Sequence, residues 1–448
     1  MSVFPSCIFK TVNGIFKSRK QLFQLHRLRN YIIECCYEFQ SKACIHQFFR
    51  AISKHVRRDF AKTFVVPVGL PKAPKLFSNV LVVDFGGASV RAGIAATTGP
   101  TLPKIFFPTV MAVGRSNEAE KYFGFDAFAP EIRTRCTLRQ PMAPSGKIDK
   151  LSVDLIALQG IFEKIFKDLD VDPSNFEIQL SAPRTFGDSV KRAIADMLFD
   201  EFSVRSVNMA HQTVFAMFAY NAKSGVVVDL GERMDVVPVV DGYKVSSGVS
   251  RSSVGGLEMR SKLQHHLQGR NYSLGSFIDG FLLRYAIETS AYMSRNFDKE
   301  LERYRLNPTK IDQRIDVSQN VTLDMGSERF EACEGLFKPE LWGLDQAGVH
   351  VLVHKAIREC GVDVRKEITQ SIFLAGGLTM IPGFKERLEL EVEKLTPAKP
   401  RVHASPYRYH AAYLGACVHA NSEAYEQSKV KRREWNSEAQ KKEKMWTL

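Results

Sequence analysis

The sequence lacks several features that mark specialised classes of protein. No apolar run approaches the roughly 20 residues that a membrane-spanning helix needs, so an integral membrane protein is not expected. The eight cysteines include no C-x-x-C pair, which argues against a zinc site of that spacing. The start of the chain has no apolar segment followed by small residues, so a secretory signal peptide is not expected. Reduced, structural cysteines in a reducing compartment are the expectation that remains.

Acidic residues are missing from the beginning of the chain until Glu34. Residues 1–75 hold fourteen Lys and Arg against three Asp and Glu, so +11 of the net charge of +13 lies in this arm. A charge concentrated in an arm argues against a nucleic-acid groove in the core. The arm is interpreted either as a segment that packs on the core or on a partner, or as a mitochondrial presequence, because such presequences are basic and poor in acids.

One short pattern occurs twice in the chain. Residues 80–87 form an apolar strand that ends in Asp84 and a glycine turn. Residues 225–231 repeat this pattern with Asp229. Each copy is followed by the alternating pattern of a returning strand, which predicts two hairpins. Two copies of one unit indicate two related lobes that face each other.

A third apolar strand, 372–375, runs into Gly376 and Gly377. Strands that alternate with helices are typical of an α/β protein. Helical patterns are found at 151–168, 188–201 and 384–394.

The repeated unit has the chemistry of a phosphate site. A tight glycine turn after a buried strand lets backbone N–H groups approach an anion, because no Cβ intervenes. An aspartate at the end of the strand can hold Mg²⁺ directly or through water. We therefore expect two hairpins that grip a polyphosphate from opposite sides, with Asp84 and Asp229 beside the metal.

These motifs resemble those of the actin superfamily, and within it those of actin and the actin-related proteins. Residues 84–93 and 229–232 are similar to the two phosphate loops, and 375–383 to the adenine-side loop. The segment 326–339 is similar to an actin segment outside the pocket that chaperones and sugar kinases of the superfamily lack. The resemblance covers about residues 78–420.

The resemblance implies an α/β, two-lobed actin-like (ribonuclease-H-like) ATPase fold with a nucleotide cleft, which would bind ATP or ADP with Mg²⁺. It leaves a basic N-terminal extension and a charged C-terminal helix outside the family's core. The expected division of the chain is 1–77 as the extension, 78–219 as lobe 1 with 411–420 returning to it, 220–410 as lobe 2, and 421–448 as a charged tail.

The resemblance also implies roles for individual residues. Gln212 would orient the attacking water, and Glu232 is a weaker candidate for a catalytic carboxylate near it. Asp84 and Asp229 would organise Mg²⁺ through water. The expected nucleotide-binding residues are Asp84, Gly86, Gly87, Ala88, Arg91, Asp229, Gly231, Gly256, Glu288, Gly376, Gly377, Met380 and Tyr409.

Departures from the actin pattern indicate a nucleotide that is held more than hydrolysed. The second loop is about one residue shorter than in actins, Arg233 stands in or next to the place of its second glycine, and the histidine that follows has no clear counterpart. Near-attack geometry is sensitive, since a misplacement of about 1 Å can cost about a hundredfold in rate. Other departures are Arg91 in place of Lys, Leu257 in place of Arg, and Ile287 and Tyr409 each in place of Lys.

Self-assembly is expected to be absent as well. Between 113–115 and Tyr122 the chain has six residues where actins carry a long loop that contacts the next subunit. A head-to-tail contact needs both of its surfaces. Two functions stay open: a non-polymerising subunit of a larger assembly, with partners bound by the arm and the tail, or an active actin-like ATPase. Cytoplasm and cytoskeleton are the expected location, with nucleus (a basic run at 429–433) and mitochondrion as alternatives.

Overall fold

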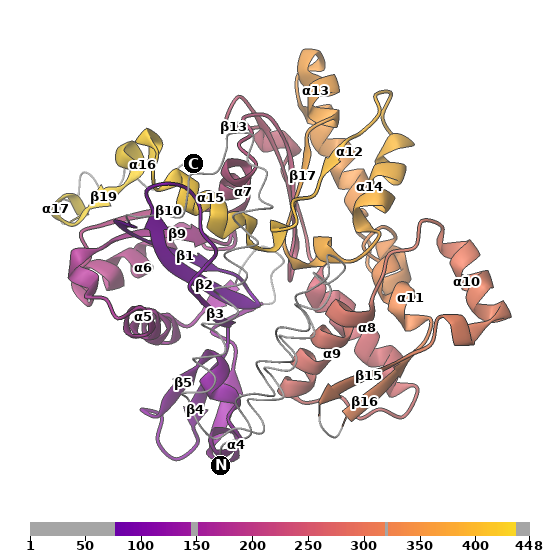
Figure 1. Ribbon diagram of the computed structural model, residues 1–448, viewed down its shortest axis with the longest axis horizontal. Helices are drawn as coiled ribbons and strands as arrows, with labels where there is room; N and C mark the ends of the chain where they lie inside the picture. Colours follow the sequence, from indigo (N-terminus) through magenta and orange to yellow (C-terminus); the bar gives the residue numbers. More distant parts are fainter. Residues whose placement is uncertain (1–76, 145–150, 319–320, 436–448) are drawn as a thin grey trace, which may run out of the picture.

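The computed structural model describes residues 77–144, 151–318 and 321–435, and within them two lobes, each built around a mixed β-sheet (Figure 1). The sheet of lobe 1 consists, in spatial order, of β19 (Val430–Lys431), β10 (Ser206–His211), β9 (Glu177–Ala182), β1 (Phe77–Phe85), β2 (Ser89–Ala96) and β3 (Ile105–Pro108). The sheet of lobe 2 consists of β13 (Tyr243–Lys244), β12 (Met234–Val240), β11 (Gly225–Leu230), β17 (Ile372–Ala375) and β18 (Val402–His403), with β14 (Ser250–Ser252) beside β12.

The two sheets share one connectivity. In lobe 1 the antiparallel hairpin β1–β2 is extended by the parallel strands β9 and β10, and in lobe 2 the hairpin β11–β12 is extended by β17 and β18 in the same way. The predicted α/β fold with two related lobes is therefore confirmed. Asp241 and Gly242 form the turn between β12 and β13, and both have positive φ (51° and 85°), which is typical of an Asp-Gly hairpin turn.

Helices cover the sheets and fill the outer ends of both lobes. In lobe 1 these are α4 (Pro130–Arg135), α5 (Leu155–Leu169) and α6 (Asp188–Asp200), together with the small strands β4 (Met111–Gly114), β5 (Lys121–Phe123), β6 (Cys136–Arg139), β7 (Met142–Pro144) and β8 (Leu151–Val153). In lobe 2 they are α8 (Gly256–Gln268), α9 (Phe277–Ser290), α10 (Phe297–Leu306), α11 (Glu328–Glu334), α12 (Val349–Glu359), α13 (Arg365–Thr369) and α14 (Phe384–Glu393), with the hairpin β15 (Gln313–Ser318) and β16 (Val321–Met325).

The helix predicted over 151–168 begins later, at Leu155. The side chain of Asp154 accepts a hydrogen bond from the backbone N–H of Ala157 at 3.0 Å and so caps the helix, while the residues before it form β8. The helices expected at 188–201 and 384–394 correspond to α6 and α14. No helix in the described part of the chain is both long enough and apolar enough to cross a membrane.

Two helices cross between the lobes, α7 (Gln212–Ala219) and α15 (Ala411–His419). They pack closely because Gly415 has no side chain: a Cβ there would lie 1.6 Å from the carbonyl oxygen of Phe215. Tyr413 and Leu414 are buried against β1 residues such as Val80 and so connect α15 to lobe 1. This crossing places Gln212, the first residue of α7, beside the end of β1.

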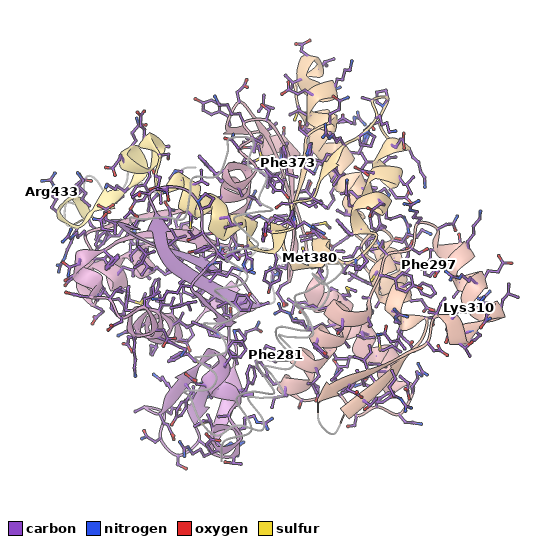
Figure 2. The ribbon with its side chains drawn as sticks, viewed as in Figure 1. Phe281, Phe297, Lys310, Phe373, Met380 and Arg433 are labelled. Carbon is purple, nitrogen blue, oxygen red and sulfur yellow. The ribbon has the colours of Figure 1, made fainter. Side chains whose placement is uncertain are left out.

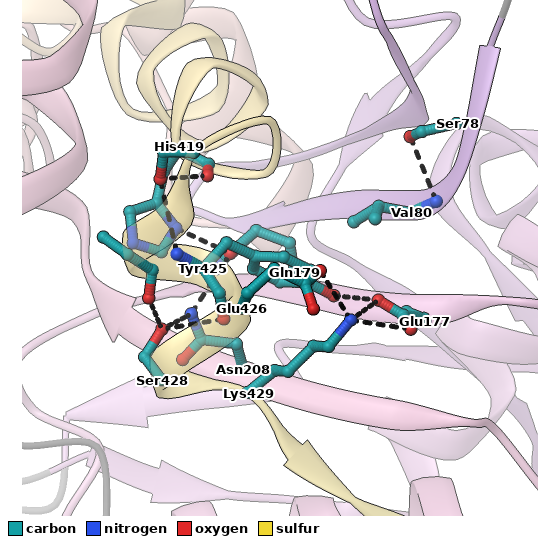
Figure 3. Close-up of polar contacts among 12 residues, drawn as sticks. Ser78, Val80, Glu177, Gln179, Asn208, His419, Tyr425, Glu426, Ser428 and Lys429 are labelled. Atoms are coloured by element: carbon teal, nitrogen blue, oxygen red, sulfur yellow. Dashed lines mark hydrogen bonds and ion pairs between the residues drawn. The ribbon is translucent and has the colours of Figure 1, made fainter.

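The segment after α15 is part of lobe 1, not a single charged helix. It forms α16 (Glu423–Ser428), strand β19 on the edge of the sheet, and α17 (Arg432–Trp435). The ammonium group of Lys429, 7% exposed, lies 2.9 Å from Glu177 and 2.7 Å from Glu426, and the Tyr425 hydroxyl donates to Glu177 at 3.0 Å (Figure 3). Because Lys429 is buried in two ion pairs, it is not accessible to an import receptor. The structure therefore gives no support to residues 429–433 as a nuclear signal. Residues 1–76 and 436–448 lie outside the described residues.

The short connection between 113–115 and Tyr122 is a tight turn between β4 and β5. The N–H of Gly114 donates to Glu120 at 2.9 Å, and the N–H of Glu120 donates to Asn117 at 3.0 Å. Arg135 forms an ion pair with Glu120 at 2.7 Å. The segment that is a long loop in actins is therefore tied back onto its own small sheet.

Candidate functional site

The loop between β1 and β2 is shaped by its own backbone. Gly86 donates its N–H to the carbonyl oxygen of Ser89 at 3.0 Å, and a Cβ at Gly86 would lie 2.8 Å from the same oxygen, so only glycine fits. Thr109 fixes the loop from outside, through its hydroxyl to the Gly86 carbonyl (2.8 Å) and its N–H to the Ala88 carbonyl (3.2 Å). This turn presents Gly87 and Ala88 toward lobe 2.

Asp84 is 1% exposed at the end of β1 and lies at the centre of a polar cluster. One carboxylate oxygen pairs with Arg91 at 2.8 Å, its partner across the β1–β2 hairpin. The other accepts hydrogen bonds from Ser181 (2.8 Å) and from the side-chain amide of Gln212 (2.9 Å). Gln212 also donates to the carbonyl of Phe85 at 3.0 Å. The structure thus brings Asp84, Arg91 and Gln212 together, and it fixes the Gln212 amide on protein acceptors.

The second loop faces the first across the junction of the lobes. A Cβ at Gly87 would lie 3.1 Å from Cγ of Glu232. Gly231 and Gly256 are adjacent, joined by a backbone hydrogen bond of 2.9 Å. Both carboxylate oxygens of Glu232 are bound by the guanidinium group of Arg260, at 2.7 and 2.8 Å. A bidentate pair of this kind is strong and directional, so the expected catalytic carboxylate is held by Arg260 of α8.

Asp229 occupies the same position in its hairpin as Asp84 does, but the residues across the two hairpins from them carry opposite charges. Its partner across the hairpin is another carboxylate, Asp235, where Asp84 has Arg91. Burial raises the pKa of Asp229 to about 7, the charges of Asp235 and Asp84 act in the same direction, and Arg91 opposes them. A cation at this point would relieve the accumulated negative charge.

The raised pKa of Asp229 predicts a pH-dependent stability. Between its ordinary value of 3.8 and about 7 the folded state holds a proton that the unfolded chain has lost, so the free energy of unfolding falls as pH rises through this window and levels off above it. The substitution Asp229→Asn removes the titrating carboxyl group, so the free energy of unfolding no longer falls with pH on its account. We expect the stability of the variant relative to wild type to grow by on the order of 1–3 kcal/mol between about pH 4.5 and about pH 7.5, measured by urea unfolding. A difference that stays constant with pH would contradict the assignment.

The third glycine loop closes the site from the side of lobe 2. Gly376 has φ of +87°, and a Cβ there would lie 2.5 Å from the carbonyl oxygen of Leu230, so this loop also requires glycine. Gly377 begins a short 3₁₀ helix that ends at Met380. Met380 is 39% exposed and lies near the middle of the molecule in Figure 2.

Tyr409 bridges the lobes beside this loop. Its ring lies against Gly377, where a Cβ would be 3.1 Å from the ring edge, and the Arg91 guanidinium carbon is 4.7 Å from the ring centroid. Arg284 donates to the Tyr409 hydroxyl at 3.1 Å and to Glu288 at 2.7 Å. The ring predicted to stack on adenine therefore already stacks on Arg91, and a base on that face would have to displace the guanidinium group.

Two residues of the site, Arg260 and Arg284, were not predicted from the sequence. Arg284 stands four residues before Glu288 on α9, a spacing typical of a helical ion pair, and could have been found from it. Arg260 is 28 residues from Glu232, so no local pattern links the two.

The residues of this site could hold the Mg²⁺ of a nucleotide only together with ligands from outside the chain, such as water and phosphate oxygens. Among the described residues, no three His, Cys, Asp or Glu side chains gather closely enough to hold a metal ion. Mg²⁺ usually keeps several waters and takes further oxygens from phosphates. The charge at Asp229 and Asp84 suits such an ion, consistent with coordination through water.

Comparisons with known proteins point to one family over most of the chain. The family model described as actin matches residues 76–442. Centractin of Schizosaccharomyces pombe is 27% identical over 379 residues, which are 81% of this chain and 97% of the relative. An actin-like protein of Neurospora crassa is 28% identical over 377 residues, covering 81% and 96%. Actin-related protein 2 of Caenorhabditis briggsae is 28% identical over 361 residues, covering 77% and 90%.

Proposed function

Because the chain belongs to the actin family, as a divergent actin-related protein, we propose that it is a nucleotide-binding subunit of a larger protein assembly, with little or no ATP hydrolysis and no filament of its own. The observation that carries this proposal is the bidentate pair between Glu232 and Arg260. Both carboxylate oxygens of Glu232, which lies opposite Gly87, are occupied by Arg260, which argues against a role for Glu232 beside an attacking water. ATP or ADP then acts as a structural ligand that joins the lobes.

The nucleotide would be held by the loops already described. The N–H groups of Gly86, Gly87 and Ala88 would face the phosphates, and Arg91 would contribute positive charge beside them. Mg²⁺, bound through water near Asp84 and Asp229, would neutralise phosphate charge. A ligand that binds only the folded state stabilises it, by about 4 kcal/mol when present at a thousand times its Kd.

We attribute slow hydrolysis to the hydrogen bonds that hold the side chain of Gln212 in place. Its amide donates both to Asp84 and to the Phe85 carbonyl, which leaves the group oriented by protein atoms. A general base or water-positioning group must reach the proton that it takes, and a small misplacement is costly in rate.

The absence of self-assembly is supported by the tight β4–β5 turn, since the contact that a long loop makes is not available from this segment. The basic arm at 1–77, with most of the net charge, is proposed as a partner-binding element, as are tail residues beyond Trp435. Cytoplasm and cytoskeleton are the proposed location.

Purified full-length protein is expected to keep ATP or ADP through gel filtration, and to release phosphate at a rate that Gln212→Ala changes by less than about two-fold. Gln159→Ala, on the outer helix α5, serves as the matched control. Nucleotide is measured by ion-exchange chromatography of the denatured protein, and filament formation by sedimentation with Mg-ATP.

Two results would overturn separate parts of this proposal. A nucleotide-free pool that resists added ATP would exclude the structural ligand. Rapid turnover that falls about a hundredfold in Gln212→Ala would favour an active ATPase, the alternative that the retained contact between Gln212 and Asp84 supports.

A further inference from the structure

A hollow of about 560 Å³ lies beside the edge of the lobe 2 sheet where β13 and β14 pair with β12, and its lining shares no residue with the nucleotide loops. Arg184, which follows β9 of lobe 1, forms one wall, and the remaining wall residues come from lobe 2. The volume is in the range of sites for small ligands. The lining residues are Arg184, Lys244, Ser246, Val249, Ser250, Arg251, Leu352 and Lys355.

The lining carries four cationic side chains and, among the described residues, no acidic one. Asp235 is the carboxylate close behind it, 3.9 Å from Nε of Arg184 and 3.8 Å from Nε of Arg251. The four cationic side chains make the lining of the hollow positively charged. Mutual repulsion in such a group is destabilising unless an anion compensates it.

Burial and these positive charges shift the pKa values of the titratable groups next to the hollow. Partial desolvation lowers the pKa of Lys244, and the charges of Arg184 and Arg251 lower it further. Burial likewise lowers the pKa of Lys191 on α6, where Asp188 opposes the effect and Lys244 and Arg184 add to it. His211 has a pKa lowered to about 3 by burial and by the same cations, so it is neutral and adds no further positive charge.

Ser250 supplies a second, independent observation. It lines the hollow and is only 7% exposed, yet its hydroxyl has no hydrogen-bond partner among the described residues. A buried hydroxyl without a partner costs free energy that a ligand oxygen would recover. Two guanidinium groups, two ammonium groups and a hydroxyl around one small hollow match the oxygens of several phosphates.

We propose that this basic hollow, formed by Arg184, Lys244, Ser250, Arg251 and Lys355, binds a compact, soluble anion that carries several phosphate groups. The site is separate from the nucleotide loops, and it joins the lobes because Arg184 belongs to lobe 1 and the other four to lobe 2. A bound anion attracts Arg184 and Arg251, which otherwise face Asp235, the hairpin partner of Asp229.

The test uses full-length protein and inositol hexakisphosphate as the probe, because this compound has no base or ribose to enter the nucleotide site. Isothermal titration calorimetry in metal-free buffer is expected to show one binding site. Lys244→Gln combined with Lys355→Gln is expected to raise the Kd by about ten-fold or more, since both charges contact the anion. Both lysines are exposed, so the folded state should be retained, which circular dichroism verifies.

Lys310→Gln is the matched control, on an exposed lysine at the outer end of lobe 2 (Figure 2), and is expected to leave the Kd unchanged. Added ATP should not displace the probe. The proposal is overturned if no single site is found, if the double variant and Lys310→Gln weaken binding equally, or if ATP competes with the probe. Tighter binding of a hexaglutamate peptide than of the probe would also overturn it, because the hollow would then fit an acidic protein segment.

Discussion

Replacing Arg387 by methionine is expected to destabilise the protein by about 3–5 kcal/mol, because the buried carboxylate of Glu334 then keeps only the longer, 3.7 Å contact with Lys338. Arg387 and Glu334 are 4% and 1% exposed, and two hydrogen bonds of 2.8 and 3.1 Å join them. Arg387 also donates to the Ser294 carbonyl (2.6 Å) and to Glu391 (2.8 Å). One guanidinium group therefore connects three separate parts of lobe 2.

The measurement is urea unfolding at neutral pH, with Arg314→Ala as the control. Arg314 pairs with Asp324 at 2.8 Å, but the two side chains are 73% and 50% exposed, so we expect a much smaller loss than for Arg387→Met. Replacing Glu334 by leucine together with Arg387→Met should restore much of the stability, since no buried charge remains. Equal losses in the buried and exposed variants would refute the argument.

This pair also explains the segment 326–339, which is actin-like but does not belong to the pocket. Glu334 ends α11 and is bound to α14 through Arg387. At the start of the segment, Glu328 accepts the N–H of Gly326 at 2.7 Å and pairs with Arg270 at 2.9 Å. The segment thus braces the helices of lobe 2, and its role is structural.

Trp435→Ala is expected to cost about 3–5 kcal/mol, a loss typical of a large buried aromatic residue. Trp435 is 3% exposed in the core of lobe 1, with its ring centroid 5.7 Å from that of Phe199. Its indole N–H donates to Asp196 at 2.7 Å. A residue in a free charged tail would show almost no effect.

Two variants separate the contributions at this position, again by urea unfolding. Trp435→Phe keeps most of the ring and loses the hydrogen bond to Asp196, for which we expect about 1–2 kcal/mol. Arg433→Ala, on an exposed neighbour, should stay within about 0.5 kcal/mol of wild type. If Trp435→Ala is as mild as Arg433→Ala, this end of the chain does not pack on lobe 1.

The framework of the fold could be predicted because its signals are local. The strand-Asp-Gly units at Asp84 and Asp229, and the glycines at 376 and 377, each combine a buried strand with a turn that a few neighbouring residues define. The C-terminal segment could not be predicted in this way. Charged residues at helical spacing indicate a helix, whereas β19 is a strand because β10 offers it an open edge.

Much of the candidate site could also be predicted, since the resemblance placed Asp84, Arg91 and Gln212 in the group that the structure brings together. Their exact partners could not. Ser181 and Gln212 reach Asp84, beside Arg91, only because β9 and α7 pack against β1, and a local sequence pattern does not show this packing.

The sequence by itself determined where the tight glycine turns lie, because the requirement for glycine at positions such as 86 and 376 is set by backbone sterics. Only the tertiary structure decided what the charged groups do. Glu232 is bound by Arg260 from another helix, Asp229 opposes Asp235, and four cations from two lobes meet in one hollow. The electrostatic energy of a charged group depends on its burial and on its partners. Both are set by residues that folding brings together from distant parts of the sequence, so a local sequence pattern does not predict them.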